Sequence, residues 1–195
     1  MTAISKDLKR VLGVRAHSGW AAYVLLCGNV DEPKILARGR MVLCDGAIGG
    51  SKQPFHEAEP MPFARAEAFI ARCKTSTAAL AAKAVAELMP IARCCILSAS
   101  GRALPELKAI LASHALIHTA EGEFYRAAIA DACAKKGIEV LRIPDRALEA
   151  EAEHLKDWRL RIAAFGKQMG SPWTQDEKHS ALGAWLALAA RRSSR

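Results

Sequence analysis

Four side chains that can bind a metal ion or move a proton recur at helical spacing in one segment. His114, His118, Glu121 and Tyr125 follow one another at intervals of four, three and four residues. On a helix, these intervals place the side chains on one face. Two histidines one turn apart, with a nearby acid, can bind zinc or another transition metal. His114, His118 and Glu121 are therefore candidate metal ligands; the alternative is a polar stripe used for helix packing. Glu121 is also a candidate catalytic acid.

Further histidines and serines lie beside expected loops. His17 and Ser18 belong to one such group, and Ser98, Ser100 and His179 could join them at one edge of a sheet. A serine beside a histidine can act as a nucleophile with its base. The sequence contains no G-x-S-x-G nucleophile elbow, so we expect these side chains mainly to satisfy backbone groups in turns. His17 and His179 remain candidate catalytic residues.

Asp176 and Glu177 lie at the expected start of the last helix. The run Thr174-Gln175-Asp176-Glu177 has the S/T-x-x-E form of a capping box. Acidic residues in a first turn also complement the helix dipole. A structural role is therefore expected for both acids, and Asp176 is retained as a candidate catalytic carboxylate.

Basic side chains form a second kind of candidate site. The chain carries 28 Lys and Arg against 20 Asp and Glu, a formal net charge of +8. Such an excess favours a polyanionic partner, usually nucleic acid, and the alternative is an inert basic surface. Phe55 and Phe63 could add base stacking, unless they turn inward. The candidate nucleic-acid-binding residues are Arg15, Lys52, His56, Arg65, Arg72 and Lys74.

The size and composition are typical of one globular domain. The chain has 195 residues, of which 51% are hydrophobic, so it can bury a sizeable core. We expect one domain over residues 1–195, with short flexible tails at about 1–9 and 190–195.

The cysteines and the N-terminus indicate a cytoplasmic protein. Six cysteines are present without a CxxC pair, which favours small buried hydrophobes in a reducing compartment. The first ten residues lack the apolar core of a signal peptide. No apolar stretch approaches the roughly 20 residues that a membrane helix needs, so no membrane association is expected.

The order of the expected elements defines the fold class. Three apolar runs separated by short turns predict an antiparallel meander, and later runs alternate with helical segments. Strands are expected at 11–15, 20–27, 35–44, 94–97 and 138–143, and helices at 63–88, 105–136 (one or two), 147–167 and from 174, with a loop at 45–62. This order predicts an α/β fold in which the meander is continued by parallel strands, with helices on both faces.

That order and three local patterns resemble the ribonuclease H-like superfamily and, within it, the RuvC family of Holliday-junction resolvases. The patterns are LGVRAHSGWA at 12–21, ALIHTAEG at 115–122 and SALGA at 180–184. The resemblance extends from Val11 to about Ala190. It implies a ribonuclease H-like mixed sheet.

The resemblance also implies where nuclease chemistry would need acids. Family nucleases hold two Mg²⁺ or Mn²⁺ ions with carboxylates from the ends of the first and fourth strands and from the last helix. Here Arg15 and Ser98 stand at the two strand positions, and Ser180 stands in the last helix. Asp176 and Glu177 are the acids left nearby. No cofactor is therefore expected, with Mg²⁺ or Mn²⁺ as the alternative.

Three hypotheses about function follow. The first is a degenerate RuvC-like domain that binds nucleic acid or a nucleoprotein partner without the usual two-metal nuclease activity. The second is a metal-dependent nuclease or hydrolase with a rearranged site built from Asp176, Glu121 and histidines. The third is a non-catalytic scaffold that forms a homodimer through its alanine-rich helices. Arg15 and Ser98 favour the first over the second, and the charge of +8 favours the first two over the third.

Overall fold

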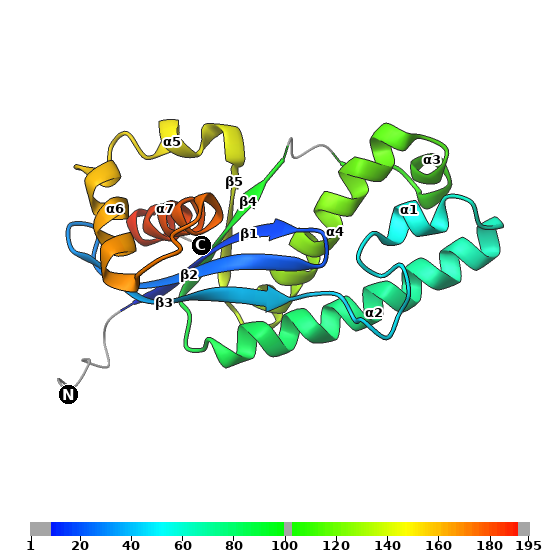
Figure 1. Cartoon of the computed structure of the whole chain (residues 1–195), viewed down its shortest axis with the longest axis horizontal. Coiled ribbons are helices and arrows are strands. Elements are labelled where there is room, and N and C mark those ends of the chain that lie inside the picture. Colours follow the sequence, from blue (N-terminus) through cyan, green and yellow to red (C-terminus); the bar gives the residue numbers. More distant parts are fainter. Residues whose placement is uncertain (1–8, 100–102, 191–195) are drawn as a thin grey trace.

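A mixed sheet forms the centre of the fold (Figure 1). The computed structural model describes residues 9–99 and 103–190. The sheet has five strands in the order β3-β2-β1-β4-β5. Their bounds are β1 Arg10–His17, β2 Trp20–Gly28, β3 Pro33–Val42, β4 Arg93–Ser98 and β5 Glu139–Pro144.

The pairing of the strands confirms the predicted meander and its parallel continuation. β1 pairs antiparallel with β2, and β2 pairs antiparallel with β3. β1 is parallel to β4, and β4 is parallel to β5. The carboxyl ends of β1, β4 and β5 therefore lie at the same edge of the sheet.

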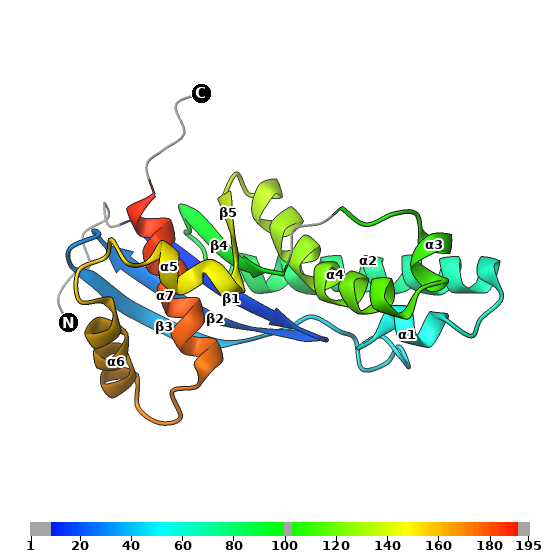
Figure 2. The same cartoon turned by 90° about the horizontal axis from the view of Figure 1, so that it is seen from above.

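Helices cover both faces of the sheet, as predicted. α2 (Phe63–Glu87) and α4 (His114–Lys135) pack on one face, where Val85 and Ile129 meet the strand residue Leu12. The other face carries α5 (Leu148–Glu151), α6 (Trp158–Met169) and α7 (Gln175–Ala189), as Figure 2 shows.

A smaller helical group extends beyond the sheet (Figure 2). It contains α1 (Pro54–Ala58), α3 (Leu107–Leu111) and the adjoining parts of α2 and α4. A separate apolar cluster holds it together, made by residues that include Phe55, Ile70, Ile110 and Ile117. The helical region expected at 105–136 is thus two helices, α3 and α4.

The loop expected at 45–62 contains the short helix α1, so that prediction was wrong in part. Pro54 stands at the start of α1, where a missing N–H costs nothing. The backbone N–H groups of Phe55 and His56 donate to Glu121 Oε1 at 2.8 and 3.0 Å. Because this carboxylate comes from α4, Pro54 is the signal that the local sequence offers for the helix start.

Three other elements differ from the expected ones, and the first is β3, which runs from Pro33 to Val42 instead of over 35–44. The single helix expected at 147–167 is divided, because the chain turns between α5 and α6 and Asp157 adopts a left-handed φ of 53°. This turn lets both Leu155 and Ile162 reach the core around α7. β1 continues to His17, which pairs with Trp20 across a two-residue turn, instead of ending at Arg15.

The predicted tails lie, apart from Lys9 and Ala190, outside the described residues. Within the described ranges, no helix combines the length and the apolar character needed to cross a membrane.

Gly13 sets how closely α7 approaches β1. A Cβ added at Gly13 would lie 1.8 Å from the backbone oxygen of Ser180, far inside contact distance. Ser180 is fully buried at this crossing, and its Oγ donates to the backbone oxygen of Ala22 on β2 at 3.3 Å. The helix therefore reaches its position only because Gly13 has no side chain.

We predict that Gly13→Ala lowers the free energy of unfolding by at least about 2 kcal/mol, because α7 must move away from the sheet. Gly46→Ala is the matched control, since nothing lies within 4 Å of a Cβ built there. Urea titrations followed by circular dichroism measure both variants. Equal stability of the two variants would contradict the close packing described here.

Candidate functional site

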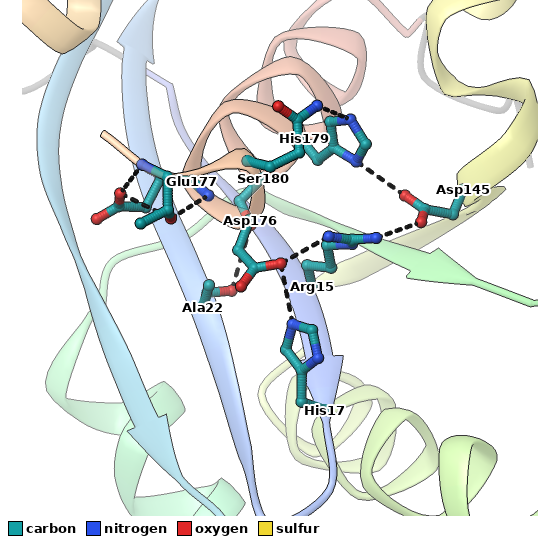
Figure 3. A network of polar contacts seen from close by, with 10 residues as sticks. Arg15, His17, Ala22, Asp145, Asp176, Glu177, His179 and Ser180 are labelled. Carbon is teal, nitrogen blue, oxygen red and sulfur yellow. Dashed lines mark hydrogen bonds and ion pairs between the residues drawn. The ribbon is translucent and has the colours of Figure 1, made fainter. Parts of the chain in front are cut away.

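A network of charged side chains lies at the carboxyl edge of the parallel strands (Figure 3). The guanidinium of Arg15 is its centre. Arg15 Nη1 donates to Asp176 Oδ1 at 2.6 Å, and Arg15 Nη2 donates to Asp145 Oδ2 at 2.7 Å. One cation thus binds a carboxylate on each side.

Three elements bring these residues together. Arg15 lies near the end of β1, Asp145 directly follows β5, and Asp176 is in the first turn of α7. The parallel arrangement of β1, β4 and β5 explains the meeting of Arg15 and Asp145, since both lie at strand ends on one edge. The packing of α7 at Gly13 then places Asp176 beside Arg15.

Two histidines complete the network. His17 Nε2 lies 3.0 Å from Asp176 Oδ1, and His179 Nδ1 lies 3.1 Å from Asp145 Oδ1. The ring of His17 stacks on Trp20 with 4.5 Å between the centroids. Each carboxylate therefore contacts Arg15 and one histidine, and the candidate residues Asp176, His17 and His179 come together as the expected topology required.

The network contains two acids and three side chains that can carry a positive charge. Asp145 and Asp176 together carry two negative charges, which face the fixed charge of Arg15 and the titratable rings of His17 and His179. Burial by itself raises the pKa of Asp176, but the hydrogen bond from Arg15 and the charge of His17 outweigh it and lower the pKa. Asp176 is therefore held ionised by protein cations.

Glu177 has the structural role that the sequence predicts. Thr174 and Glu177 form a complete capping box, in which Glu177 Oε2 accepts from the backbone N–H of Thr174 at 2.6 Å. The other oxygen, Oε1, accepts from Arg38 Nη1 at 2.8 Å. Arg38 also donates to the backbone oxygens of Pro172 and Gly170. The hydrogen bonds of Arg38 therefore hold the start of α7 and the preceding loop against β3.

The serines expected near this edge lie at different places in the structure. Ser98 is the last residue of β4 and is buried. Ser180 belongs to α7, is buried against the sheet and donates its hydroxyl to the backbone oxygen of Ala22, as described above. Ser100 lies outside the described residues, and Ser18 lies in the β1–β2 turn.

Asp145 is the residue of this network that the sequence reasoning missed. It follows β5 directly, just as Ser98 closes β4. Parallel strands end at the same edge, so the first polar residue after each predicted strand is a candidate for one site. That rule, applied to the strand expected at 138–143, would have included Asp145.

The metal candidates His114, His118 and Glu121 lie elsewhere, between α4 and α1. His114 Nε2 and His118 Nε2 are 3.0 Å apart, and His56 of α1 joins them. Glu121 is buried and accepts hydrogen bonds from α1 rather than pointing toward His114. Burial raises the pKa of Glu121 more than these hydrogen bonds lower it.

The predicted basic surface is spread over several faces. Lys52, Arg65, Arg72 and Lys74 are exposed, whereas His56 is half-buried. Arg65 and Arg72 are seven residues apart on α2 and so share a face. Lys74 instead lines a cavity of about 310 Å³ between α2 and α4.

The two phenylalanines that could stack on bases differ in their exposure. Phe55 is buried and packs edge-to-face on Phe124 at 5.8 Å, so it turns inward. Phe63 is 46% exposed at the start of α2, where a nucleic-acid base can reach it. Nucleic-acid binding by the basic candidates, including Arg15, remains a prediction. Both terminal nitrogens of the Arg15 guanidinium already donate to acids.

The fold is similar to that of solved structures of another protein. The arrangement of strands and helices is ribonuclease H-like and resembles RuvC. RuvC of Thermus thermophilus, in a complex with a Holliday junction substrate, superposes with a TM-score of 0.53 and 8% identity, over 91% of this chain and 91% of that chain.

A second structure of Thermus thermophilus RuvC gives a TM-score of 0.49 and 9% identity, over 91% of this chain and 92% of that chain. No family model matches the sequence. No curated protein matches it either. At such low identity the similarity defines the fold, and the chemistry must be argued from the side chains.

We predict that Asp176→Asn destabilises the protein by about 1–2 kcal/mol near neutral pH, because Arg15 loses one of its two acids. The lowered pKa of Asp176 in the folded state fixes the sign of the pH dependence. The ionised form contributes stability above the ordinary value of 3.8, and this contribution is lost as the pH falls through the folded pKa. The difference between parent and variant should therefore shrink in acid.

Urea titrations over a pH series measure this difference. Asp31→Asn, at an exposed acid in the β2–β3 turn, is the control and should change stability by less than about 0.5 kcal/mol. A parent–variant difference that stays constant down to about pH 2 would show that the charge of Asp176 does not stabilise the fold.

Proposed function

We propose that this chain is a degenerate RuvC-like domain that binds nucleic acid without the usual two-metal nuclease activity. The observation that carries the proposal is the position of Arg15. Its guanidinium binds Asp145 and Asp176 at 2.7 and 2.6 Å, at the edge of the sheet where the resemblance places the metal ions of the nucleases.

The argument against two-metal chemistry is electrostatic. Two divalent ions a few ångströms apart repel each other and need several anionic oxygens to hold them. Of the residues at this edge, Asp145 and Asp176 supply carboxylates, and each of them already binds Arg15 and lies beside a histidine. A divalent ion would have to displace a guanidinium that makes two charge-assisted hydrogen bonds.

The argument for nucleic acid is the charge of the chain and its fold. A net charge of +8 favours binding to a polyanion. Arg65 and Arg72 place two exposed basic residues on one face of α2, and exposed Phe63 lies in the same half of that helix. The similar RuvC structure holds a Holliday junction substrate, which makes branched DNA the first probe to test.

We predict salt-dependent binding that is largely blind to sequence. Phosphate contacts release counterions, so affinity should fall steeply as salt rises. Reversing two contacts with Arg65→Glu and Arg72→Glu should weaken binding to all probes and reduce the slope of log affinity against log salt by about 2. Gel-shift titrations with four-way junction, duplex and single-stranded DNA and with RNA, at two salt concentrations, measure both effects.

The matched control is the double variant Arg161→Glu and Lys167→Glu. Both residues are exposed on α6, on the opposite face of the sheet, and the change in net charge is the same. Equal loss of binding in the two double variants would place the contact surface elsewhere. No binding to any probe at low salt would favour the dimeric scaffold instead.

Cleavage assays with Mg²⁺ and Mn²⁺ on the same probes test the second half of the proposal. We expect the unaltered protein to leave all of them intact. Cleavage that Asp176→Ala abolishes would show that the network is a rearranged active site, which is the hydrolase hypothesis.

A further inference from the structure

Three histidines from two helices converge beside the helical group at the end of the sheet. His56 comes from α1, and His114 and His118 come from successive turns of α4. One ligand nitrogen from each ring lies within 4.8 Å of the others. His114 and His118 are exposed and His56 is half-buried, so solvent reaches the point where the rings meet.

The spacing of these nitrogens is close to that of a zinc site. Two nitrogens bound at about 2.0–2.1 Å to one tetrahedral zinc ion lie about 3.3 Å apart. His114 Nε2 and His118 Nε2 are 3.0 Å apart, so each already directs the same nitrogen to one point. The third nitrogen lies within 4.8 Å of these two, and the rings of His114 and His118 are exposed and can rotate about their side-chain bonds.

Glu121 provides a second and independent observation. Its Oε1 lies 3.2 Å from Nδ1 of His56 and also accepts the backbone N–H groups of Phe55 and His56. A carboxylate that accepts from Nδ1 keeps the proton there and leaves the lone pair of Nε2 free for a metal ion. A carboxylate behind a metal-binding histidine is the usual support of such ligands.

The burial of Glu121 strengthens this assignment. Glu121 is only 4% exposed, and its Oε2 is buried without a hydrogen-bond partner among the described residues. Burying a carboxylate costs free energy unless a positive charge or sufficient donors compensate it. A cation bound to the ring that Glu121 contacts would supply that compensation.

We propose that His56, His114 and His118 bind one Zn²⁺ ion, with Glu121 as a positioning residue and water in the fourth position. Three neutral imidazoles match zinc and other first-row transition metals rather than Mg²⁺, which prefers oxygen ligands. The fourth position is open because the two rings of α4 are exposed.

The site goes beyond the proposed nucleic-acid binding and does not depend on it. It lies between α1 and α4, whereas the Arg15 network lies between β1, α7 and the end of β5. A bound zinc ion would join α1 to α4 directly. The contact between α1 and Glu121 at the helix start would then be reinforced by the contact of His56 with the metal ion.

The test is a titration of the full chain with Zn²⁺, followed by calorimetry and by competition with a chromophoric chelator. We expect one Zn²⁺ per chain and a raised Tm, because the ion binds only the folded arrangement. His114→Ala and His118→Ala each remove a ligand at an exposed helical position, where alanine keeps the helix, and each should lower the affinity at least about 100-fold. Mg²⁺ should neither bind at this site nor compete.

One control variant, one variant of the positioning residue and one metal substitution complete the test. His154→Ala removes an exposed histidine outside the cluster and should leave Zn²⁺ affinity unchanged. Glu121→Gln should lower it about 10–100-fold, as loss of a partner behind a ligand does, while circular dichroism confirms the fold. Co²⁺ in place of Zn²⁺ should give the visible bands of a tetrahedral nitrogen site without a thiolate charge-transfer band, which excludes the free cysteines.

Two results would overturn the proposal. One is the absence of stoichiometric Zn²⁺ binding by the unaltered chain. The other is binding whose affinity is the same in His114→Ala, His118→Ala and the parent. Either result would leave the nucleic-acid proposal intact, because that proposal is tested with α2 and α6 variants without added zinc.

Discussion

The guanidinium of Arg15 joins three elements that are far apart in the sequence and meet only in the folded chain. Its partners Asp145 and Asp176 come from the end of β5 and the start of α7. The side chain of Arg15 is 26% exposed, so solvent only partly screens these ion pairs. Removal of the cation would leave two carboxylates facing each other at the sheet edge, which is costly in a partly buried site. The arrangement of charge at this edge therefore depends on one residue.

The same edge is where the proposed function departs from that of a two-metal nuclease. The sheet brings the ends of β1, β4 and β5 to one edge, and the close packing of α7 at Gly13 brings the last helix to the same edge. Where metal ions would contact acids in a nuclease, the guanidinium of Arg15 binds both acids here, and one histidine lies beside each acid. The three-histidine cluster on α1 and α4 has the opposite character, because its rings offer nitrogen ligands and Glu121 lies behind one of them. The two proposals therefore give a metal ion to the histidine cluster and none to the Arg15 network.

The sequence was sufficient for the order of strands, the mixed sheet and the capping box of α7, because these depend on local periodicity and local hydrogen bonds. It was not sufficient for α1, whose first N–H groups bind Glu121 from another helix. The spacing of His114 and His118 was visible, but His56 joins them only through tertiary packing. Asp145 was missed because the acids were sought at positions taken from the resemblance, and not at every strand end. The break between α5 and α6 depends on which residues can reach the core, and helical periodicity alone does not show it.

The most direct test of the central claim is calorimetric titration of Mg²⁺ and Mn²⁺ into the parent, Arg15→Asp and Arg15→Gln. Arg15→Gln removes the cation, whereas Arg15→Asp also adds an oxygen ligand beside Asp145 and Asp176. If Arg15 replaces the metal ions, the parent should show no saturable binding, Arg15→Gln weak binding and Arg15→Asp the tightest. Strong, stoichiometric binding by the parent, or no gain in a correctly folded Arg15→Asp variant, would contradict the account.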